Sequence, residues 1–212
     1  MRKLAIFTPV FAVLSFVLLF AQFSSAQLAS DQQFDLFVGG STTFSATPSS
    51  STNFLPEENG GLYINLGGDA VFLRHRLGIN IGSAWRATQG VYLAGVENYR
   101  PVLTDFNLLY QPRIGKKLGL DLMGGIGAGS TRFYQPGPSC GSCGATYVST
   151  DHFMEHLGGG LRYYVWHHAF IRPEVNYYHI QNNTSVEDNG FSSNNLLRVG
   201  ASVGYTFGGG SD

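Results

Sequence analysis

The feature that most constrains the fold is an alternation, with a period of two residues, between apolar side chains and small or polar ones. In residues 197–207 every second side chain is apolar, whereas Arg198, Ser202 and Thr206 occupy positions between them. Residues 118–128 and 169–178 follow the same pattern. Because successive side chains of a β-strand point to opposite faces, each segment is predicted to be a strand with one apolar and one polar face.

Along the whole chain the alternation predicts eight strands. They are residues 33–44, 62–73, 77–88, 100–114, 117–133, 152–165, 168–180 and 195–207. Most exceed the roughly 9–11 residues that a tilted strand needs to cross a bilayer. Short turns near 74–76, 115–116 and 166–167 alternate with long polar loops at 45–61, 89–99, 134–151 and 181–194. The sequence therefore predicts an all-β fold, an eight-stranded antiparallel up-and-down transmembrane β-barrel.

The first 26 residues have a different character. They begin with Arg2 and Lys3, continue with an apolar stretch and end on small residues up to Ala26. This pattern predicts a cleaved signal peptide, 1–26, followed by the barrel domain, 27–212. A permanent transmembrane helix is disfavoured, because polar residues interrupt the apolar stretch and no basic segment follows it.

Composition and charge narrow the class of protein. The chain has 28 Gly and 16 Phe with only 13% charged residues, which is unusual for a soluble globule, and its aromatic content argues against disorder. Without Arg2 and Lys3, 11 basic residues remain against 14 acidic ones. Nucleic acid is therefore not expected as a partner.

The alternation sends five acids and five arginines to the barrel interior. They are Asp35, Asp69, Arg86, Asp105, Arg113, Asp121, Arg162, Arg172, Glu174 and Arg198. The densest cluster is expected at Asp69, Arg113, Asp121, Arg162, Arg172 and Glu174. An eight-stranded barrel is just wide enough for side chains to fill it, and buried charges must be paired. A salt-bridge network is therefore favoured over a pore lining or a catalytic constellation.

The assignment of inward and outward faces can be tested with one residue and compared with one alternative fold. Glu155 is predicted to lie on the outward face three residues into its strand, so we expect it in the headgroup region. A soluble lipocalin-like barrel, the alternative fold, would turn its apolar face inward around a ligand. The balanced charges and glycines on the polar face favour the membrane barrel instead.

The segments Leu118–Gly125 and Arg198–Phe207 resemble the small OmpA-like outer-membrane β-barrel domains. The resemblance implies a bacterial outer-membrane protein with periplasmic termini and extracellular loops, surrounded by outer-membrane lipid and lipopolysaccharide. It also implies insertion by the barrel assembly machinery, which reads a terminal aromatic residue, although here residues 208–212 follow Phe207. We expect a non-enzymatic protein without cofactors, whose loops serve envelope integrity or adhesion to a surface ligand.

Cys140 and Cys143 lie in the third long loop and are predicted to form a local disulfide, as expected of thiols in an oxidising compartment. A redox role would need a helix N-terminus, which Pro136 and Pro138 disfavour. Zinc would need two further ligands, and His152 is the only obvious nearby candidate.

His179 is predicted to face outward, in a segment that resembles the catalytic strand of outer-membrane lipid A deacylases. Those enzymes have a His-x-Ser-Asn pattern, in which the histidine activates the serine and an acid orients the histidine. Here Gln181 replaces the serine, and Glu187 could be the acid. Since an amide is no nucleophile, no catalytic residue is expected. A lipid-modifying enzyme and a narrow channel remain the alternatives.

Overall fold

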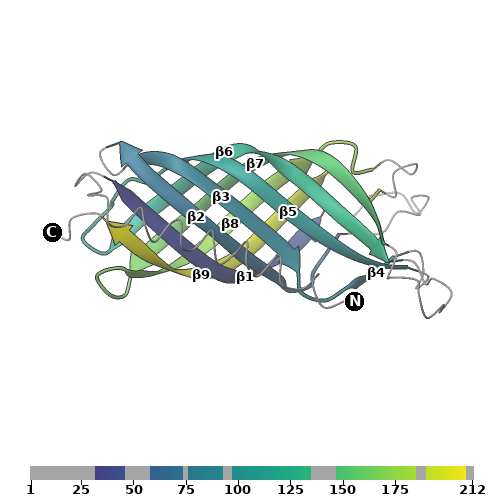
Figure 1. The fold of residues 1–212 in the computed structure, drawn as a ribbon, viewed down its shortest axis with the longest axis horizontal. Helices are drawn as coiled ribbons and strands as arrows, with labels where there is room; N and C mark the ends of the chain where they lie inside the picture. The colour runs from purple at the N-terminus through teal and green to yellow at the C-terminus, as the bar shows by residue number, and fades with distance from the viewer. Residues whose placement is uncertain are drawn as a thin grey trace, which may run out of the picture.

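The structure, a computed structural model, describes residues 32–45, 58–73, 76–92, 97–134, 147–184 and 190–208. These residues form nine strands (Figure 1): β1 (Gln33–Ser45), β2 (Tyr63–Leu73), β3 (Leu77–Arg86), β4 (Gly90–Tyr92), β5 (Glu97–Tyr110), β6 (Leu118–Tyr134), β7 (Tyr147–Tyr164), β8 (Ala169–Ile180) and β9 (Asn195–Gly208). The predicted signal peptide and both cysteines lie outside the described residues.

The strands form one antiparallel sheet in the order β3-β2-β1-β9-β8-β7-β6-β5-β4. Because β3 also pairs with β5, from Leu77 opposite Tyr110 to Trp85 opposite Val102, eight strands close into a barrel. The three-residue β4 is an extension that pairs with β5. The predicted eight-stranded antiparallel barrel is confirmed. None of the described residues belongs to a helix long and apolar enough to span a membrane.

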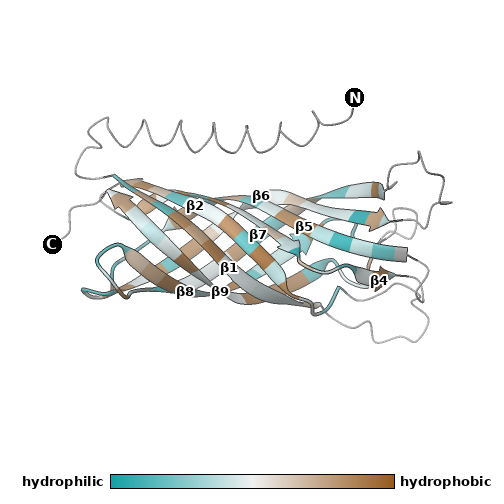
Figure 2. Cartoon of the chain, turned by 60° about the horizontal axis from the view of Figure 1, so that its bottom comes forward, coloured by the Kyte–Doolittle hydropathy of each residue, from teal (hydrophilic) through white to brown (hydrophobic). Residues whose placement is uncertain are grey.

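The two faces of the wall have opposite polarity. On the outside, Leu108 is 72% exposed and Leu157 64%, whereas on the inside Asp69 and Arg162 are fully buried. Figure 2 shows hydrophobic and hydrophilic residues alternating along the strands, with hydrophilic segments in the strands near the right-hand end of the barrel. Large apolar side chains on the outside suit lipid, so the arrangement is that of a membrane barrel and excludes a lipocalin-like interior.

The strands extend further than predicted at the end where the long loops lie, which we call the loop end. β7 begins at Tyr147 rather than at 152, and β5 at Glu97 rather than at 100. At this end the outward side chains of β7, Ser149 and Asp151, are polar and exposed. The alternation disappears there, because a wall that leaves the hydrocarbon no longer needs an apolar outer face. Glu155 consequently lies in mid-strand, and not three residues from the start.

The opposite end, with the turns 111–117 and 165–168 and the strand ends Gln33 and Gly208, is called the turn end. There β5 stops at Tyr110 instead of continuing to 114. Pro112 has no N–H to donate to the ladder, and Arg113 forms only an isolated bridge with Gly119. The prediction that Arg113 faces the lumen is therefore wrong, because its side chain is exposed in the turn.

Inward glycines make room for aromatic rings. A Cβ added to Gly67 would lie 2.5 Å from the carbonyl oxygen of Ile81 and would collide with the Phe37 ring. That ring lies 3.9 Å from the guanidinium carbon of Arg172. The glycine thus allows an aromatic platform for a buried cation to fit inside a narrow barrel.

Candidate functional site

Two arginines form the centre of the lumen. Arg162, on β7, is completely buried and forms ion pairs with Asp35, with Asp69 at 2.7 Å and with Asp121 at 3.0 Å. Arg172, on β8, is 1% exposed. It lies 3.0 Å from Asp69 and 3.4 Å from Asp121, so the same two carboxylates bridge both arginines. Asp35, Asp69 and Asp121 come from strands other than those of the two arginines, so these ion pairs join different strands.

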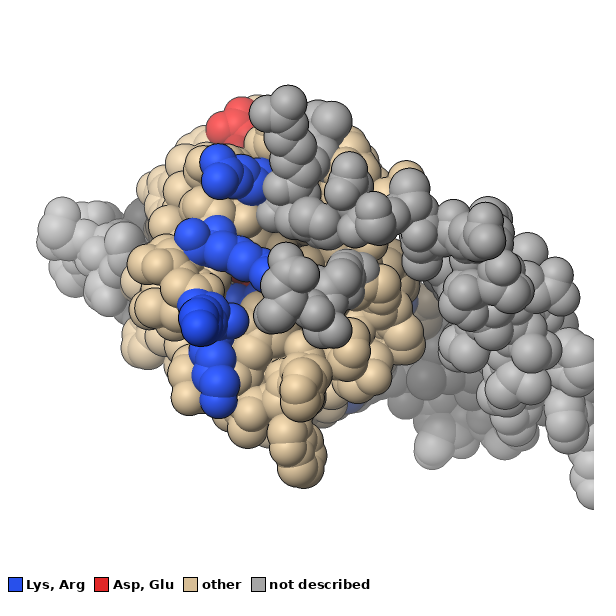
Figure 3. Space-filling model, turned by 90° about the vertical axis from the view of Figure 1, so that its left-hand side faces the viewer, with Lys and Arg blue, Asp and Glu red and all other residues tan. Residues whose placement is uncertain are grey.

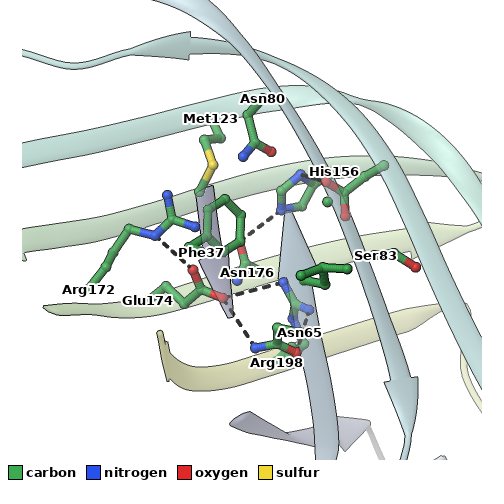
Figure 4. Close-up of a pocket in the computed structure, with 13 residues that line it drawn as sticks. Phe37, Asn65, Asn80, Ser83, Met123, His156, Arg172, Glu174, Asn176 and Arg198 are labelled. Carbon is green, nitrogen blue, oxygen red and sulfur yellow. Dashed lines mark hydrogen bonds and ion pairs between the residues drawn. The ribbon is translucent and has the colours of Figure 1, made fainter. Parts of the chain in front are cut away.

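A chain of polar contacts extends the network toward the loop end. Arg172 donates to Glu174 at 3.1 Å, and Arg198 lies 3.6 Å from the other oxygen of Glu174. Arg198 also donates to the side-chain oxygen of Asn65 at 3.1 Å. Figure 4 shows Arg172 and Arg198 pointing at Glu174 from opposite sides. One carboxylate thereby couples two cations.

His156 organises a second layer in mid-barrel. Its ring nitrogens lie 2.6 Å from the side-chain oxygen of Asn107 and 3.0 Å from that of Asn176. The ring stacks on Tyr178 with centroids 4.6 Å apart, and Nδ1 lies 3.8 Å from Asp105. His156 was not among the predicted network residues, although its position in the alternation marks it as inward.

The lumen holds more carboxylates than arginines. Five acids are buried there against Arg162, Arg172 and Arg198, because Arg113 lies in the turn and Arg86 lies at the loop-end mouth. Amide side chains supply the missing donors. Asn80 donates to Asp69 at 2.5 Å, Asn107 to Asp105 at 2.6 Å, Gln111 to Asp121 at 3.0 Å and Gln33 to Asp35 at 3.0 Å. A census of charged residues alone misses these partners.

The space left inside is small. A cavity of about 20 Å³ lies among Phe37, Met123, His156, Arg172 and Glu174. This volume is close to the minimum that holds one water molecule. Around this cavity the lumen is therefore closely packed with polar side chains, and a buried hydrophobic cluster that includes Leu103, Met154 and Ile180 also lies within the barrel.

Aromatic residues close the loop end. Tyr92, Tyr99, Phe133 and Phe191 form a buried cluster, in which the Tyr92 and Phe133 centroids are 5.0 Å apart. Tyr92 donates to the carbonyl oxygen of Gly190 at 2.9 Å. Arg86 donates to the Tyr99 hydroxyl at 2.7 Å. We call this cluster the aromatic cap, and it joins segments from three of the long loops or their flanking strands.

Glu58 is buried beside the aromatic cap, at 3% exposure. Burial raises the pKa of its carboxyl from 4.5 to about 7, although a hydrogen bond from Asn183 and the charge of Arg86 oppose this rise. A group with this pKa changes its charge within the physiological pH range. The sequence gives no sign of it, since Glu58 lies outside every predicted strand.

The outer wall carries a polar group at the end of β8. His179 Nδ1 lies 3.0 Å from the side-chain oxygen of Asn195, which also accepts a hydrogen bond from the Tyr177 hydroxyl at 2.6 Å. Glu155 is the cross-strand partner of His179. Among the described residues no serine hydroxyl is hydrogen-bonded to His179. Glu187, the predicted acid, lies outside the described residues.

The sequence matches the outer membrane protein beta-barrel domain family over residues 15–207, and the chain belongs to this family. No curated protein matches it. The structure is similar to a major outer membrane protein from Thermus thermophilus, with 13% identity and a TM-score of 0.56 over 83% of this chain and 99% of that one.

It is also similar to Ail of Yersinia pestis, solved with the heparin analogue sucrose octasulfate, with 13% identity and a TM-score of 0.53 over 84% of this chain and 99% of Ail. For Neisserial surface protein A the identity is 10% and the TM-score 0.52, over 82% and 96% of the two chains. At such identities the structures share the fold alone. The family and the fold identify an integral protein of the bacterial outer membrane.

Replacing Arg172 with Leu should lower the thermal unfolding temperature of the barrel in detergent. The change leaves three buried carboxylates with fewer partners, at a cost on the order of 3–5 kcal/mol. Folded and unfolded barrels differ in electrophoretic mobility. The unfolding temperature is the temperature at which heated samples lose the mobility of the folded protein. Arg113→Leu, in the exposed turn, is the matched control and should change little. An unchanged temperature for Arg172→Leu would show that the network does not stabilise the barrel.

Unfolding of the loop end should depend on pH through Glu58. Because its folded pKa is raised, the folded state loses stability as pH rises from about 4.5 to about 7, by up to about 3 kcal/mol. The thermal unfolding temperature should therefore rise on Glu58→Gln at pH 8 and change little at pH 4. Asp151→Asn, an exposed carboxylate at the same end, is the control. If Glu58→Gln changed the unfolding temperature equally at pH 4 and pH 8, the idea that Glu58 is buried as an uncharged carboxyl would be contradicted.

Proposed function

We propose that this outer-membrane barrel is non-enzymatic and presents its long loops at the cell surface, where they serve envelope integrity or adhesion to a partner. The turn end and both ends of the barrel domain then face the periplasm. The observation that carries this proposal is the packed lumen, whose cavity of about 20 Å³ has no room for a solute. Other molecules are therefore expected to contact the two ends of the barrel or its outer wall.

The charges of the loops indicate what kind of surface partner fits. The four loops contain neither Lys nor Arg and, besides the buried Glu58, five acids: Glu57, Glu97, Asp151, Glu187 and Asp188. An acidic surface attracts cationic partners and repels polyanions. We therefore favour a basic peptide or protein surface as the partner. The polyanionic ligand named for the Ail structure does not suit these loops.

Lipopolysaccharide is proposed as the lipid partner just below the loops. Arg100 and Arg132 face each other across β5 and β6 on the outer wall, and they lie against the rings of Tyr134 and Tyr147. Like charges directly opposite are destabilising unless an anion joins them. Phosphate groups of lipopolysaccharide match the charge and geometry of paired guanidinium groups.

The enzymatic alternative receives less support. His179 has the hydrogen-bond partner Asn195 and the cross-strand neighbour Glu155, but Gln181 occupies the position of the nucleophile. An acyl transfer to the protein needs a hydroxyl or thiol that the histidine can deprotonate. The group is better explained as a polar patch at the lipid boundary.

The barrel should insert into planar bilayers without conductance. We expect the ion network and the aromatic cap together to block the passage of hydrated ions. Single-channel recording after insertion, verified by the electrophoretic shift, tests this expectation. Discrete conductance steps from the folded protein would favour the narrow-channel alternative and overturn the closed lumen.

The proposed orientation can be tested with the lysines of the chain. Apart from Lys3, the sequence contains only Lys116 and Lys117, both at the turn end. A membrane-impermeant amine reagent should therefore leave the protein unlabelled on intact cells and label it after the outer membrane is permeabilised.

The matched control is Thr184→Lys, which adds one amine at an exposed position of the loop end. This variant should be labelled on intact cells. Labelling of the unaltered protein to the same extent on intact cells would reverse the orientation.

A further inference from the structure

Four cations gather along one side of the turn end. They are Arg76, Arg113, Lys116 and Lys117, and all are exposed. Figure 3 looks onto this end and shows Lys and Arg side chains in a row along one side of the barrel, with acidic atoms near the upper end of the row and uncharged residues over most of the remaining described surface. We call these four residues the basic crescent.

Backbone hydrogen bonds hold the turns of the crescent together. The N–H of Gln111 donates to the carbonyl oxygen of Arg76 at 2.6 Å, which joins the β2–β3 turn to the end of β5. The N–H of Tyr164 donates to the carbonyl oxygen of Lys117 at 2.9 Å, which joins the β5–β6 turn to the end of β7. The cations are thus displayed from a connected rim and not from independent loops.

The positive charge of the crescent is not neutralised within the described residues. No described carboxylate forms an ion pair with any of its four side chains. The nearby acids of this half of the barrel, Asp35 and Asp121, are fully buried and paired with Arg162. The network that fills the lumen therefore leaves the crescent available for an external anion.

A concave surface adjoins the crescent. An open cavity of about 340 Å³ is lined by Arg113, Lys116 and Lys117 and, on the β7–β8 turn, by Trp166 and His167. This volume lies within the range of small-ligand sites. Cations from one turn thus face an aromatic side chain from the next across a shared hollow.

The apolar residues of the same turns indicate the source of the anion. Trp166 is 76% exposed, Ile114 60% and Val165 48%. A soluble polyanion would leave these side chains in water, whereas a bilayer surface takes the apolar groups into the interface and brings lipid phosphates to the cations. The combination fits a membrane leaflet.

We propose that the basic crescent binds the phosphate of an anionic phospholipid, such as phosphatidylglycerol, in the leaflet that the turn end faces. Trp166 and Ile114 enter the interface beside the headgroup, while Lys116, Lys117 and Arg113 contact its phosphate. The inference rests on the proposed function only in naming this leaflet as the periplasmic one. Binding of acidic lipid would bias how the barrel is anchored in an asymmetric membrane.

Trp166 provides a built-in reporter for the test. A Trp85→Phe protein has Trp166 as its one tryptophan among the described residues, and it is reconstituted in phosphatidylcholine vesicles containing either brominated phosphatidylglycerol or brominated phosphatidylcholine. Bromine quenches tryptophan fluorescence on contact. We expect the relative binding constant to favour phosphatidylglycerol about fivefold or more, since each lysine or arginine near an acidic lipid surface contributes about that factor. The preference should weaken in high salt.

The variant Arg113→Gln, Lys116→Gln, Lys117→Gln should remove the preference, and Lys117→Gln alone should reduce it. Arg100→Gln with Arg132→Gln, which removes cations from the opposite end, is the matched control and should retain it. Each variant is first shown to be folded by its electrophoretic shift.

Equal quenching by both brominated lipids, or a preference that survives in the triple variant, would overturn the proposal. Poly-glutamate could bind the protein in pure phosphatidylcholine vesicles through the crescent, while the lipids show no preference. This result would assign the crescent to a soluble acidic partner. The vesicle measurement does not depend on which end faces the cell exterior, so its failure and a reversed orientation are separate results.

Discussion

The structure depends on the compensation of buried charge inside a barrel whose outer wall faces lipid. Arg162 and Arg172 share Asp69 and Asp121, and these four residues come from β2, β6, β7 and β8. Burying an unpaired guanidinium or carboxylate would cost several kcal/mol, so the pairs select the one register in which all four strands bring their charges together. The ion network thereby fills much of a lumen that also contains two buried hydrophobic clusters, one around Leu103 and Met154 and a smaller one at Val71, Leu109 and Met123.

The filled lumen also separates the two ends of the molecule. The aromatic cap and buried Glu58 occupy the loop end, and the sequences of the four long loops contain acids and no Lys or Arg. The basic crescent occupies the other end. The internal acids and arginines form ion pairs with one another. The surface charges of the two ends therefore remain available to external partners. Recognition is therefore expected at the rims, with cationic partners at the loops and anionic lipid at the turns.

The strand pattern could be predicted wherever the wall meets lipid, because only there must every second side chain be apolar. Prediction was weaker where the wall leaves the hydrocarbon. For this reason the alternation predicts too late a start for β7, and it does not predict β4, because a three-residue strand is too short to show a period. The alternation predicts an inward Arg113 only if the strand continues through Pro112, whereas β5 ends at Tyr110. Asn80 and Asn107 also occupy inward positions of the alternation, but a search for charged residues alone does not find them.

By itself the sequence determined the eight-stranded barrel, its inner and outer faces and its membership of an outer-membrane class, since alternation and lipid exposure are properties of each strand in isolation. The tertiary structure decided which charges meet, that amides from neighbouring strands satisfy the surplus acids, and that cations from separate turns gather on one rim. These outcomes depend on strand register and on the closure of β3 onto β5. Both bring together residues far apart in the chain, so no local pattern encodes them.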